Sequence, residues 1–263
     1  MSNDPKAIFD HTILEREIKN IIATAVEGGQ SPSMELKDSH PNLCRTFVIA
    51  TSKHAGGAVR MRTFRTTYRK PFPACIWQVA RATSAAPTFF APIEIRDEVY
   101  GDGGTGWNNP AKEAIAEALD IWPKRRIGIL VSIGTGLEKE LELKDQPVRI
   151  PELMQLLLKN TSPGNMFKLA VAEYAVACLT SCEMVHRELA DHPDQYVLHG
   201  NYFRLNVPQG MAEIGLAEWD KLPKMISLTN RYMEHGEMKQ PIWNIANLLQ
   251  FPQRASRAYH FSV

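Results

Sequence analysis

The chain has 263 residues, of which 44% are apolar, 22% charged and 8% aromatic, and its formal net charge is +1. This is ordinary globular usage, and it argues against disordered, collagen-like and coiled-coil proteins. The near-neutral charge creates no overall field that would attract nucleic acid or an anionic membrane. A charged partner must therefore be bound locally.

Targeting signals and metal-binding patterns are missing from the sequence. No stretch approaches the roughly 20 apolar residues of a spanning helix, and no secretory signal is visible, so we expect a cytoplasmic protein that contacts membranes only peripherally. The four cysteines, Cys44, Cys75, Cys178 and Cys182, fit neither a metal site nor a disulfide framework, and we expect buried free thiols. No histidine has metal-ligand spacing, so we expect no metal ion and no cofactor.

The first third of the chain predicts two helices and two strands. Ile13 to Glu27 has apolar residues at helical spacing, with Thr12 as a possible cap. Thr46 to Ala50 is a short apolar run rich in β-formers. Ala58 to Phe64 alternates apolar and polar residues, as a half-exposed strand does. Pro73 opens a predicted helix that ends near Ser84, because a residue before a proline, here Pro87, avoids helical geometry.

The stretch from Glu94 to Gly136 has the order of a βαβ unit. A strand or hairpin at Glu94 to Tyr100 runs into Asp102-Gly103-Gly104. Asn109 can cap a helix that starts at Pro110 and continues to Trp122. A second apolar run, Ile127 to Ile133, ends at Gly134-Thr135-Gly136. This succession predicts a parallel sheet, in which chemistry gathers at the carboxyl ends of the strands.

The remainder of the chain is predicted to be mostly helical. Helical spacing occurs in four segments, and one later strand is expected at Tyr202 to Val207. No repeat or linker divides the chain, so we expect a single domain over residues 1–263. Its motif-bearing part covers residues 8–136 and its helical part residues 137–263. The four helical segments are Pro151 to Lys159, Phe167 to Leu189, Leu222 to Met233 and Ile242 to Leu249.

Asp102 is the main catalytic candidate. A carboxylate at a strand end, followed by Gly103 and Gly104, is well placed to act as a general base where backbone can approach a substrate. The alternative is an Asp-Gly turn in which Asp102 bonds its own backbone, and taken alone the triplet favours this turn.

The sequence provides no matching nucleophile. The segment from Ser132 to Gly136 fits neither phosphate-loop pattern and is better explained as a strand-ending turn. No serine in the chain has glycine both two residues before and two residues after it, as the G-x-S-x-G elbow requires. The nucleophile is therefore assigned to no residue of this chain.

Residues 60–70 contain five basic side chains with Phe64 and Tyr68 among them. Such a segment can bind phosphate head groups or nucleic acid. The more frequent explanation is a solvated strand face, which we favour.

Four motifs in order resemble the patatin-like phospholipase family. They are residues 76–90 (IWQVARATSAAPTFF), Asp102 to Gly104, Asn108 to Pro110, and residues 131–136 (VSIGTG). Phe9-Asp10, residues 202–207 (YFRLNV) and residues 215–219 (GLAEW) resemble fungal-type members and extend the resemblance over residues 8–236.

The resemblance implies an α/β, three-layer patatin-like fold, also described as FabD/lysophospholipase-like, with a mainly parallel sheet. It implies a lipid acyl hydrolase with a Ser-Asp dyad, in which Asp102 is the proton acceptor. The family's glycine-rich oxyanion loop and serine elbow lie before the region that matches here, which implies a carboxyl-terminal portion of the domain, incomplete at its N-terminus and inert alone.

Three functions remain open at this stage. The first is a lipid ester hydrolase of patatin type, and the second is a non-catalytic relative that serves as a lipid- or protein-binding module. The third is a Ser-His-Asp hydrolase, for which His235 or His260 would supply only the histidine. The expected partner is a lipid ester, with peripheral contact to a membrane and no nucleic acid.

Overall fold

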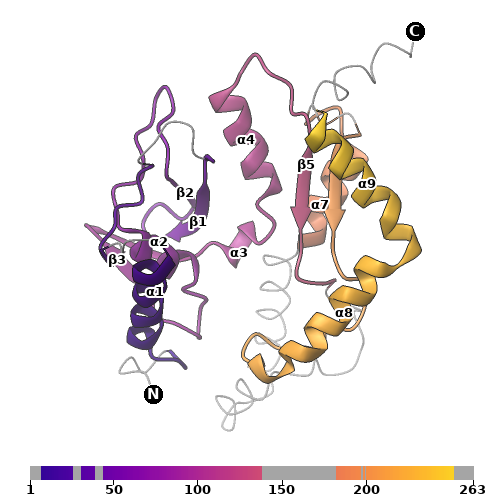
Figure 1. The fold of residues 1–263 in the computed structure, drawn as a ribbon. Helices are drawn as coiled ribbons and strands as arrows, with labels where there is room; N and C mark the ends of the chain where they lie inside the picture. Colours follow the sequence, from indigo (N-terminus) through magenta and orange to yellow (C-terminus); the bar gives the residue numbers. More distant parts are fainter. Residues whose placement is uncertain are drawn as a thin grey trace, which may run out of the picture. The chain divides into compact units, whose positions relative to one another are not determined.

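The computed structural model describes residues 7–25, 31–38, 44–137, 182–196, 198 and 200–251. The chain divides into two compact units, Met1–Pro110 and Ala111–Val263, whose described elements are shown in Figure 1. Each unit contains its own sheet and its own apolar core. Among the described ranges, no helix combines the length and the apolar character needed to cross a bilayer.

The first unit contains a four-stranded sheet in the order β2-β1-β4-β3, in which every pairing is antiparallel. The expectation of a mainly parallel sheet is wrong for this unit. The reason is the length of the connections: only residues 53–57 separate β1 from β2, and only residues 96–97 separate β3 from β4, whereas parallel strands need a long crossover. The strands are β1 (Phe47–Ser52), β2 (Ala58–Arg62), β3 (Ile93–Ile95) and β4 (Glu98–Asp102).

Two helices complete the first unit. Helix α2 (Ile76–Thr83) contacts β1, β3 and β4, and α1 (His11–Ala25) contacts α2. Ala50, Met61, Val79 and Tyr100 lie in the core between α2 and the sheet. Burial of these apolar side chains is the main force that holds the helix on the sheet.

Both helices begin at residues different from those predicted. Asp10 caps α1: its Oδ1 accepts hydrogen bonds from the Thr12 N–H at 2.9 Å and the Thr12 hydroxyl at 2.7 Å. The predicted cap, Thr12, is therefore wrong. Helix α2 starts after Cys75, not at Pro73, because the Gln78 side chain accepts the Cys75 N–H at 2.9 Å and so fixes the N-terminus there.

The second unit contains the parallel pairing. Strand β5 (Leu130–Ile133) pairs in parallel with β6 (Tyr202–Leu205), so the strands expected at both places are confirmed. Since β5 pairs with β6 and β4 pairs with β1 and β3, the stretch from β4 to β5 is not the predicted βαβ unit. Ala111, Ile115, Leu189 and Leu198 form this unit's core.

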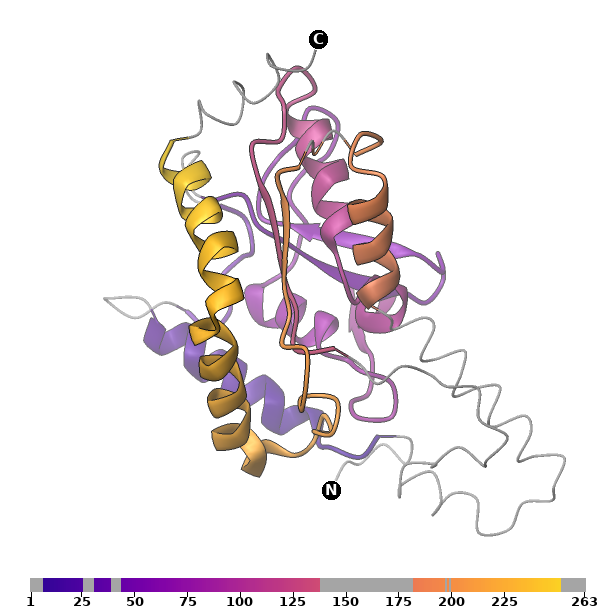
Figure 2. The same ribbon diagram turned by 90° about the vertical axis from the view of Figure 1, so that its right-hand side faces the viewer.

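Helices account for most of the remaining described part of the second unit, as Figure 2 shows. The segment predicted at 151–159 lies outside the described residues, as does the part of 167–189 before Cys182. The last helix is longer than predicted: it begins at Gly236 and not at Ile242, so Pro241 lies inside it. The helices are α4 (Ala111–Ile121), α7 (Cys182–Asp191), α8 (Leu222–Glu234) and α9 (Gly236–Gln250), with a short 3₁₀ turn η1 (Trp219–Lys221).

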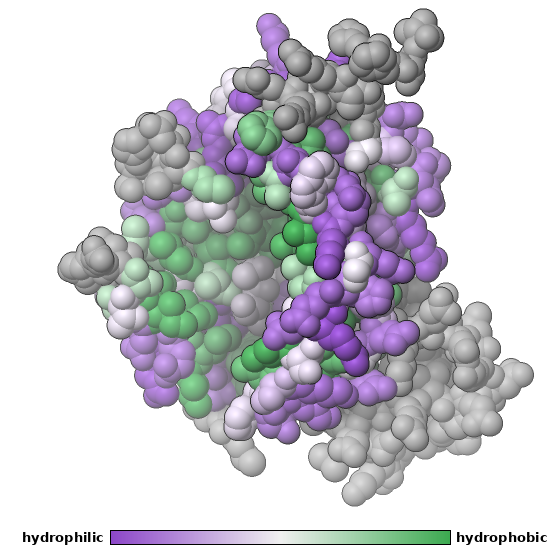
Figure 3. Space-filling view, turned by 45° about the vertical axis from the view of Figure 1, so that its right-hand side comes forward, coloured by the Kyte–Doolittle hydropathy of each residue, from purple (hydrophilic) through white to green (hydrophobic). Residues whose placement is uncertain are grey.

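The surface of the second unit is mixed in character. Large apolar side chains on α8 and α9 are exposed, among them Ile226, Met233 and Trp243. Figure 3 shows hydrophobic and hydrophilic side chains next to one another on the described surface. Scattered exposed apolar residues are normal in proteins, so these alone do not indicate a binding site.

Candidate functional site

Asp102 is the last residue of β4, and its main chain is held from two sides. Its N–H donates to the carbonyl of Ala85 at 3.1 Å, just beyond the end of α2. Its own carbonyl accepts a hydrogen bond from the Thr51 hydroxyl of β1 at 2.9 Å. Asp102 is also the register partner of Ala50. These contacts fix the half-buried carboxyl group at the end of its strand.

The carboxylate makes a local hydrogen bond. Its Oδ1 accepts the N–H of Gly104 at 2.6 Å, which is the bond expected of an Asp-Gly turn. No described residue donates to Oδ2. The turn and the general base are therefore compatible, because one oxygen fixes the turn while the other is available to a substrate or nucleophile.

Close approach requires glycine at position 103 and disfavours a side chain at position 104. A Cβ atom at Gly103 would lie 2.3 Å from the Ile49 carbonyl oxygen, which no side chain tolerates. A Cβ atom at Gly104 would lie 3.1 Å from Asp102 Oδ1. Helix α3 (Gly104–Trp107) begins at this point, so the triplet allows the chain to leave the sheet tightly.

Burial raises the pKa of the Asp102 carboxyl, and the hydrogen bond from Gly104 opposes this with a smaller effect. Desolvation disfavours the charged form of a carboxylate. Asp102 is consequently a stronger base than a solvated aspartate, as proton abstraction from a hydroxyl requires.

Asn108, Asn109 and Pro110 follow directly in the chain. Asn108 ends α3, and its Oδ1 would lie 3.6 Å from a Cβ atom at Gly104, so it lies beside the triplet. Asn109 is buried, with 4% of its surface exposed. Helix α4 begins at Ala111, one residue later than the predicted start at Pro110.

Glu98, a second carboxylate in the first unit, contacts Ser52. The sequence did not predict this contact. The Ser52 hydroxyl donates to Glu98 Oε1 at 2.8 Å and accepts the N–H of Ala55 at 2.9 Å. Glu98 also accepts the N–H of His54 at 3.1 Å. Because Ser52 is only 2% exposed, this cluster stabilises the β1–β2 turn and gives no access to a substrate.

Ser132 and His235 of the second unit do not form a catalytic pair, because their polar contacts in the described part of the chain are with other residues. Ser132 is 8% exposed and accepts a hydrogen bond from Arg204 Nη1 at 2.9 Å. The ring of His235 lies 3.9 Å from Glu237 and belongs to the start of α9. His260 lies outside the described residues.

The cysteines that the structure describes are free thiols. Cys44 is exposed, whereas Cys75 and Cys182 are half-buried, so the expectation that they are buried is wrong. Cys178 lies outside the described residues. Within the ranges that can be described, no group of three or more potential ligands is arranged to hold a metal ion.

Comparison with known proteins connects the Asp102 region to an enzyme family. Residues 3–115, which include Asp102 and both glycines, match the family described as patatin-like phospholipase. This segment belongs to the patatin-like phospholipase family. The family resemblance inferred from the sequence motifs is confirmed over residues 3–115, and Asp102 lies within this segment.

Individual relatives extend the similarity. The mouse (Mus musculus) calcium-independent phospholipase A2-gamma is 30% identical over 247 residues, which are 89% of this chain and 28% of the relative. The human (Homo sapiens) protein of the same name is 41% identical over 61 residues, 23% of this chain and 8% of that protein. Phospholipase A I of Arabidopsis thaliana is 31% identical over 106 residues, 40% of this chain and 8% of that protein. The chain thus spans less than a third of the length of these relatives.

Proposed function

We propose that this chain takes part in the hydrolysis of lipid acyl esters and supplies the proton acceptor, Asp102, of a Ser-Asp dyad. The observation that carries the proposal is the half-buried carboxylate at the end of β4, within a segment of the patatin-like phospholipase family. The printed names of the relatives, which are phospholipases A, support a phospholipid or similar ester as substrate.

In this mechanism, a serine oxygen attacks the ester carbonyl while Asp102 Oδ2 accepts the hydroxyl proton. The tetrahedral intermediate then expels the alcohol, which takes that proton from Asp102 as the acyl-serine ester forms. A water molecule hydrolyses the acyl-serine, and Asp102 accepts a proton from this water and returns it to the serine. Gly104 holds Oδ1 throughout, so the carboxylate does not turn away.

The serine and the oxyanion donors are assigned by this proposal to polypeptide outside these 263 residues. No serine of the sequence lies in a G-x-S-x-G elbow. The same observation supports a second function, a non-catalytic patatin-like module that binds lipid or protein. In the hydrolase, Asp102 accepts a proton from a serine nucleophile, whereas in the non-catalytic module Asp102 has no such partner.

The deciding experiment fuses a patatin-like glycine-rich loop and serine elbow to the N-terminus of the whole chain. The assay measures kcat on a short-chain aryl ester. Asp102→Asn should reduce kcat by about 10⁴-fold or more, since removal of a dyad member is nearly as damaging as removal of the pair. Asp97→Asn, in the exposed β3–β4 turn, is the matched control and should leave kcat unchanged.

Two results would contradict the hydrolase proposal. One is an Asp102→Asn fusion that folds and keeps kcat within a few fold of the parent. The other is a folded, inactive fusion with Asp102 intact, which would favour the non-catalytic module. Thermal unfolding of each variant establishes that the comparison is made between folded proteins.

A further inference from the structure

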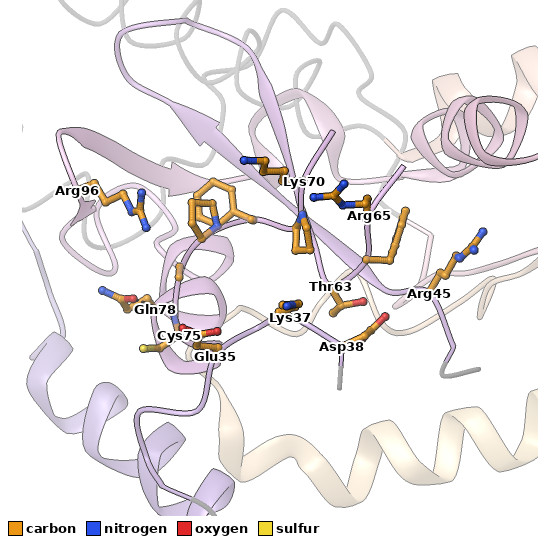
Figure 4. Close-up of a pocket in the computed structure, with 15 residues that line it drawn as sticks. Glu35, Lys37, Asp38, Arg45, Thr63, Arg65, Lys70, Cys75, Gln78 and Arg96 are labelled. Carbon is orange, nitrogen blue, oxygen red and sulfur yellow. Dashed lines mark hydrogen bonds between the residues drawn. The ribbon is translucent and has the colours of Figure 1, made fainter. Parts of the chain in front are cut away.

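The first unit contains a cavity of about 830 Å³ that does not include Asp102. Figure 4 shows Arg65 and Lys70 along one side of it, with Lys37 on the opposite side. Charged residues from four separate stretches of the chain line it. The cationic ones are Lys37, Arg45, Arg65, Lys70 and Arg96, and the acidic ones are Glu35 and Asp38.

Cations outnumber carboxylates in this lining, and several are not neutralised. Lys37, Arg65, Lys70 and Arg96 are exposed, and none has an ion-pair partner in the part of the chain that the structure describes. Cationic side chains that converge on a hollow concentrate positive potential there. The cavity therefore favours an anionic ligand.

The basic stretch at residues 60–70 supplies part of this lining. Arg65 and Lys70 face the cavity, so they are more than members of a solvated strand face. Arg62 is not solvated either: it is only 6% exposed, and its Nη1 donates to the Arg60 carbonyl at 3.1 Å. The interpretation that favoured a solvated face is wrong for Arg62, whereas Arg65 and Lys70 are exposed, as that interpretation predicts.

Apolar side chains form the rest of the wall. Phe64, Pro71, Phe72 and Pro73 line the same cavity. The ring of Phe72 packs edge-on against Tyr100, with 5.8 Å between ring centres, so this wall is anchored to the core. A ligand with both an anionic group and an apolar stem would satisfy both halves of the lining.

The cavity is separate from the candidate catalytic carboxylate. Cys75 and Gln78, at the start of α2, line it, whereas Asp102 is bonded to Ala85, beyond the end of α2. A helix of eight residues is about 12 Å long at 1.5 Å per residue. The cavity at the start of α2 is therefore a site apart from the carboxylate of Asp102.

We propose that this cavity binds the phosphate group of an anionic lipid. Lysine and arginine are the usual partners of phosphate, and guanidinium groups such as that of Arg65 bind its oxygens in pairs. The apolar wall favours a lipid as the carrier of the phosphate over free phosphate. Nucleic acid is disfavoured, because the chain has a net charge of only +1.

The experiment measures binding to the whole 263-residue chain by titration calorimetry, without any hydrolysis. The probes are lysophosphatidate below its micelle concentration, inorganic phosphate, and monoacylglycerol as the uncharged equivalent. Lysophosphatidate should bind, inorganic phosphate should compete more weakly, and monoacylglycerol should not bind. Arg65→Gln and Lys70→Gln should each weaken lysophosphatidate binding about tenfold, the size of one lost charge-assisted hydrogen bond. Arg69→Gln, an exposed neighbour that does not line the cavity, should bind as the parent does.

Three results would overturn the proposal. If Arg69→Gln weakens lysophosphatidate binding as much as Arg65→Gln does, the effect is one of overall charge and not of the cavity. If monoacylglycerol binds as tightly as lysophosphatidate, the phosphate group has no role in binding. Equal affinity for inorganic phosphate would assign the cavity to free phosphate and not to a lipid. Asp102→Asn should leave the binding unchanged, so failure of this site and failure of the proposed hydrolase are distinguishable.

Discussion

The carboxylate of Asp102 and the main-chain N–H of Gly104 are joined by a hydrogen bond of 2.6 Å, at the point where β4 ends and α3 begins. The bond holds one carboxylate oxygen and leaves the other without a partner in the described residues. One short segment thus forms a tight turn and presents a partly desolvated base, and the following predictions separate these two properties.

The first prediction concerns stability and pH. Burial raises the pKa of Asp102 in the folded protein, so its ionised form destabilises the fold at pH values above that pKa. Asp102→Asn should therefore raise Tm at pH 7, and the gain should shrink as the pH falls through the raised pKa and vanish below the ordinary aspartate value of about 3.9. Circular dichroism melts from pH 3 to 8 measure this, with Asp97→Asn as the exposed control. A lower Tm at every pH would mean that the carboxylate is needed for the turn.

The second prediction concerns the rate. In the serine-bearing fusion, the ester-hydrolysis rate should fall at acid pH as Asp102 is protonated. Because burial raises its pKa, the midpoint should lie above the ordinary aspartate value of about 3.9. The pH profile of kcat/KM on an aryl ester measures this midpoint. A midpoint at or below that of a solvated aspartate would contradict the desolvated-base description.

The third prediction concerns Gly103. Gly103→Ala places a methyl group 2.3 Å from the Ile49 carbonyl oxygen, so the strand or the turn must move. Overpacking of this kind costs about 1–3 kcal/mol in the free energy of unfolding. Gly57→Ala, whose added Cβ would be 3.9 Å from the nearest atom, is the control and should change it little. Urea unfolding of both variants gives the comparison, and equal stability would show that the backbone relaxes freely there.

The local features of this site follow from sequence because they depend on neighbouring residues. The strands at Phe47–Ser52 and Leu130–Ile133 and the D-G-G turn after β4 are all set by short-range pattern and turn chemistry. The pairing of the strands is different, since it depends on contacts far apart in the chain. The sequence allowed a strand or a hairpin at Glu94 to Tyr100, and the structure has the hairpin, in which the two-residue turn at Arg96, whose φ is 59°, joins β3 to β4. Arg-Asp is not one of the strong hairpin signals, so the sequence did not decide between the two.

The residues that line the cavity could not be grouped from sequence either. Arg65 and Lys70 were visible as a basic stretch, but Lys37 and Arg96 are distant in sequence and carry no pattern that connects them. The Ser52–Glu98 contact likewise joins residues 46 positions apart. Such groupings arise only when the chain folds, so sequence spacing does not reveal them.

The fourth prediction concerns Glu98. The His54 N–H first, and then the Ser52 hydroxyl, lower the pKa of Glu98 by hydrogen bonding to its charged form. This interaction stabilises the fold above the ordinary glutamate value near 4.3, and the stabilisation is lost as the pH falls through the lowered pKa. Glu98→Gln should lower Tm by a few degrees at pH 7 and by less below about pH 4. Glu94→Gln, on the exposed side of β3, is the control. A Tm difference that persists at pH 3 would show that the charge is not responsible.

The fifth prediction concerns the serines of the chain. A fluorophosphonate probe labels serines whose hydroxyl is activated and accessible, and the two buried serines that have polar partners are not accessible. Ser52 donates its proton to Glu98 inside the β1–β2 turn, and Ser132 accepts a hydrogen bond from Arg204. The 263-residue chain should therefore remain unlabelled, whereas the serine-bearing fusion should label once, at the introduced elbow. Intact-protein mass spectrometry measures both, with a heat-denatured sample as the control for non-specific reaction. Stoichiometric labelling of any serine in the folded chain would overturn the assignment of the nucleophile to another part of the polypeptide, and peptide mapping would then identify the residue that replaces it.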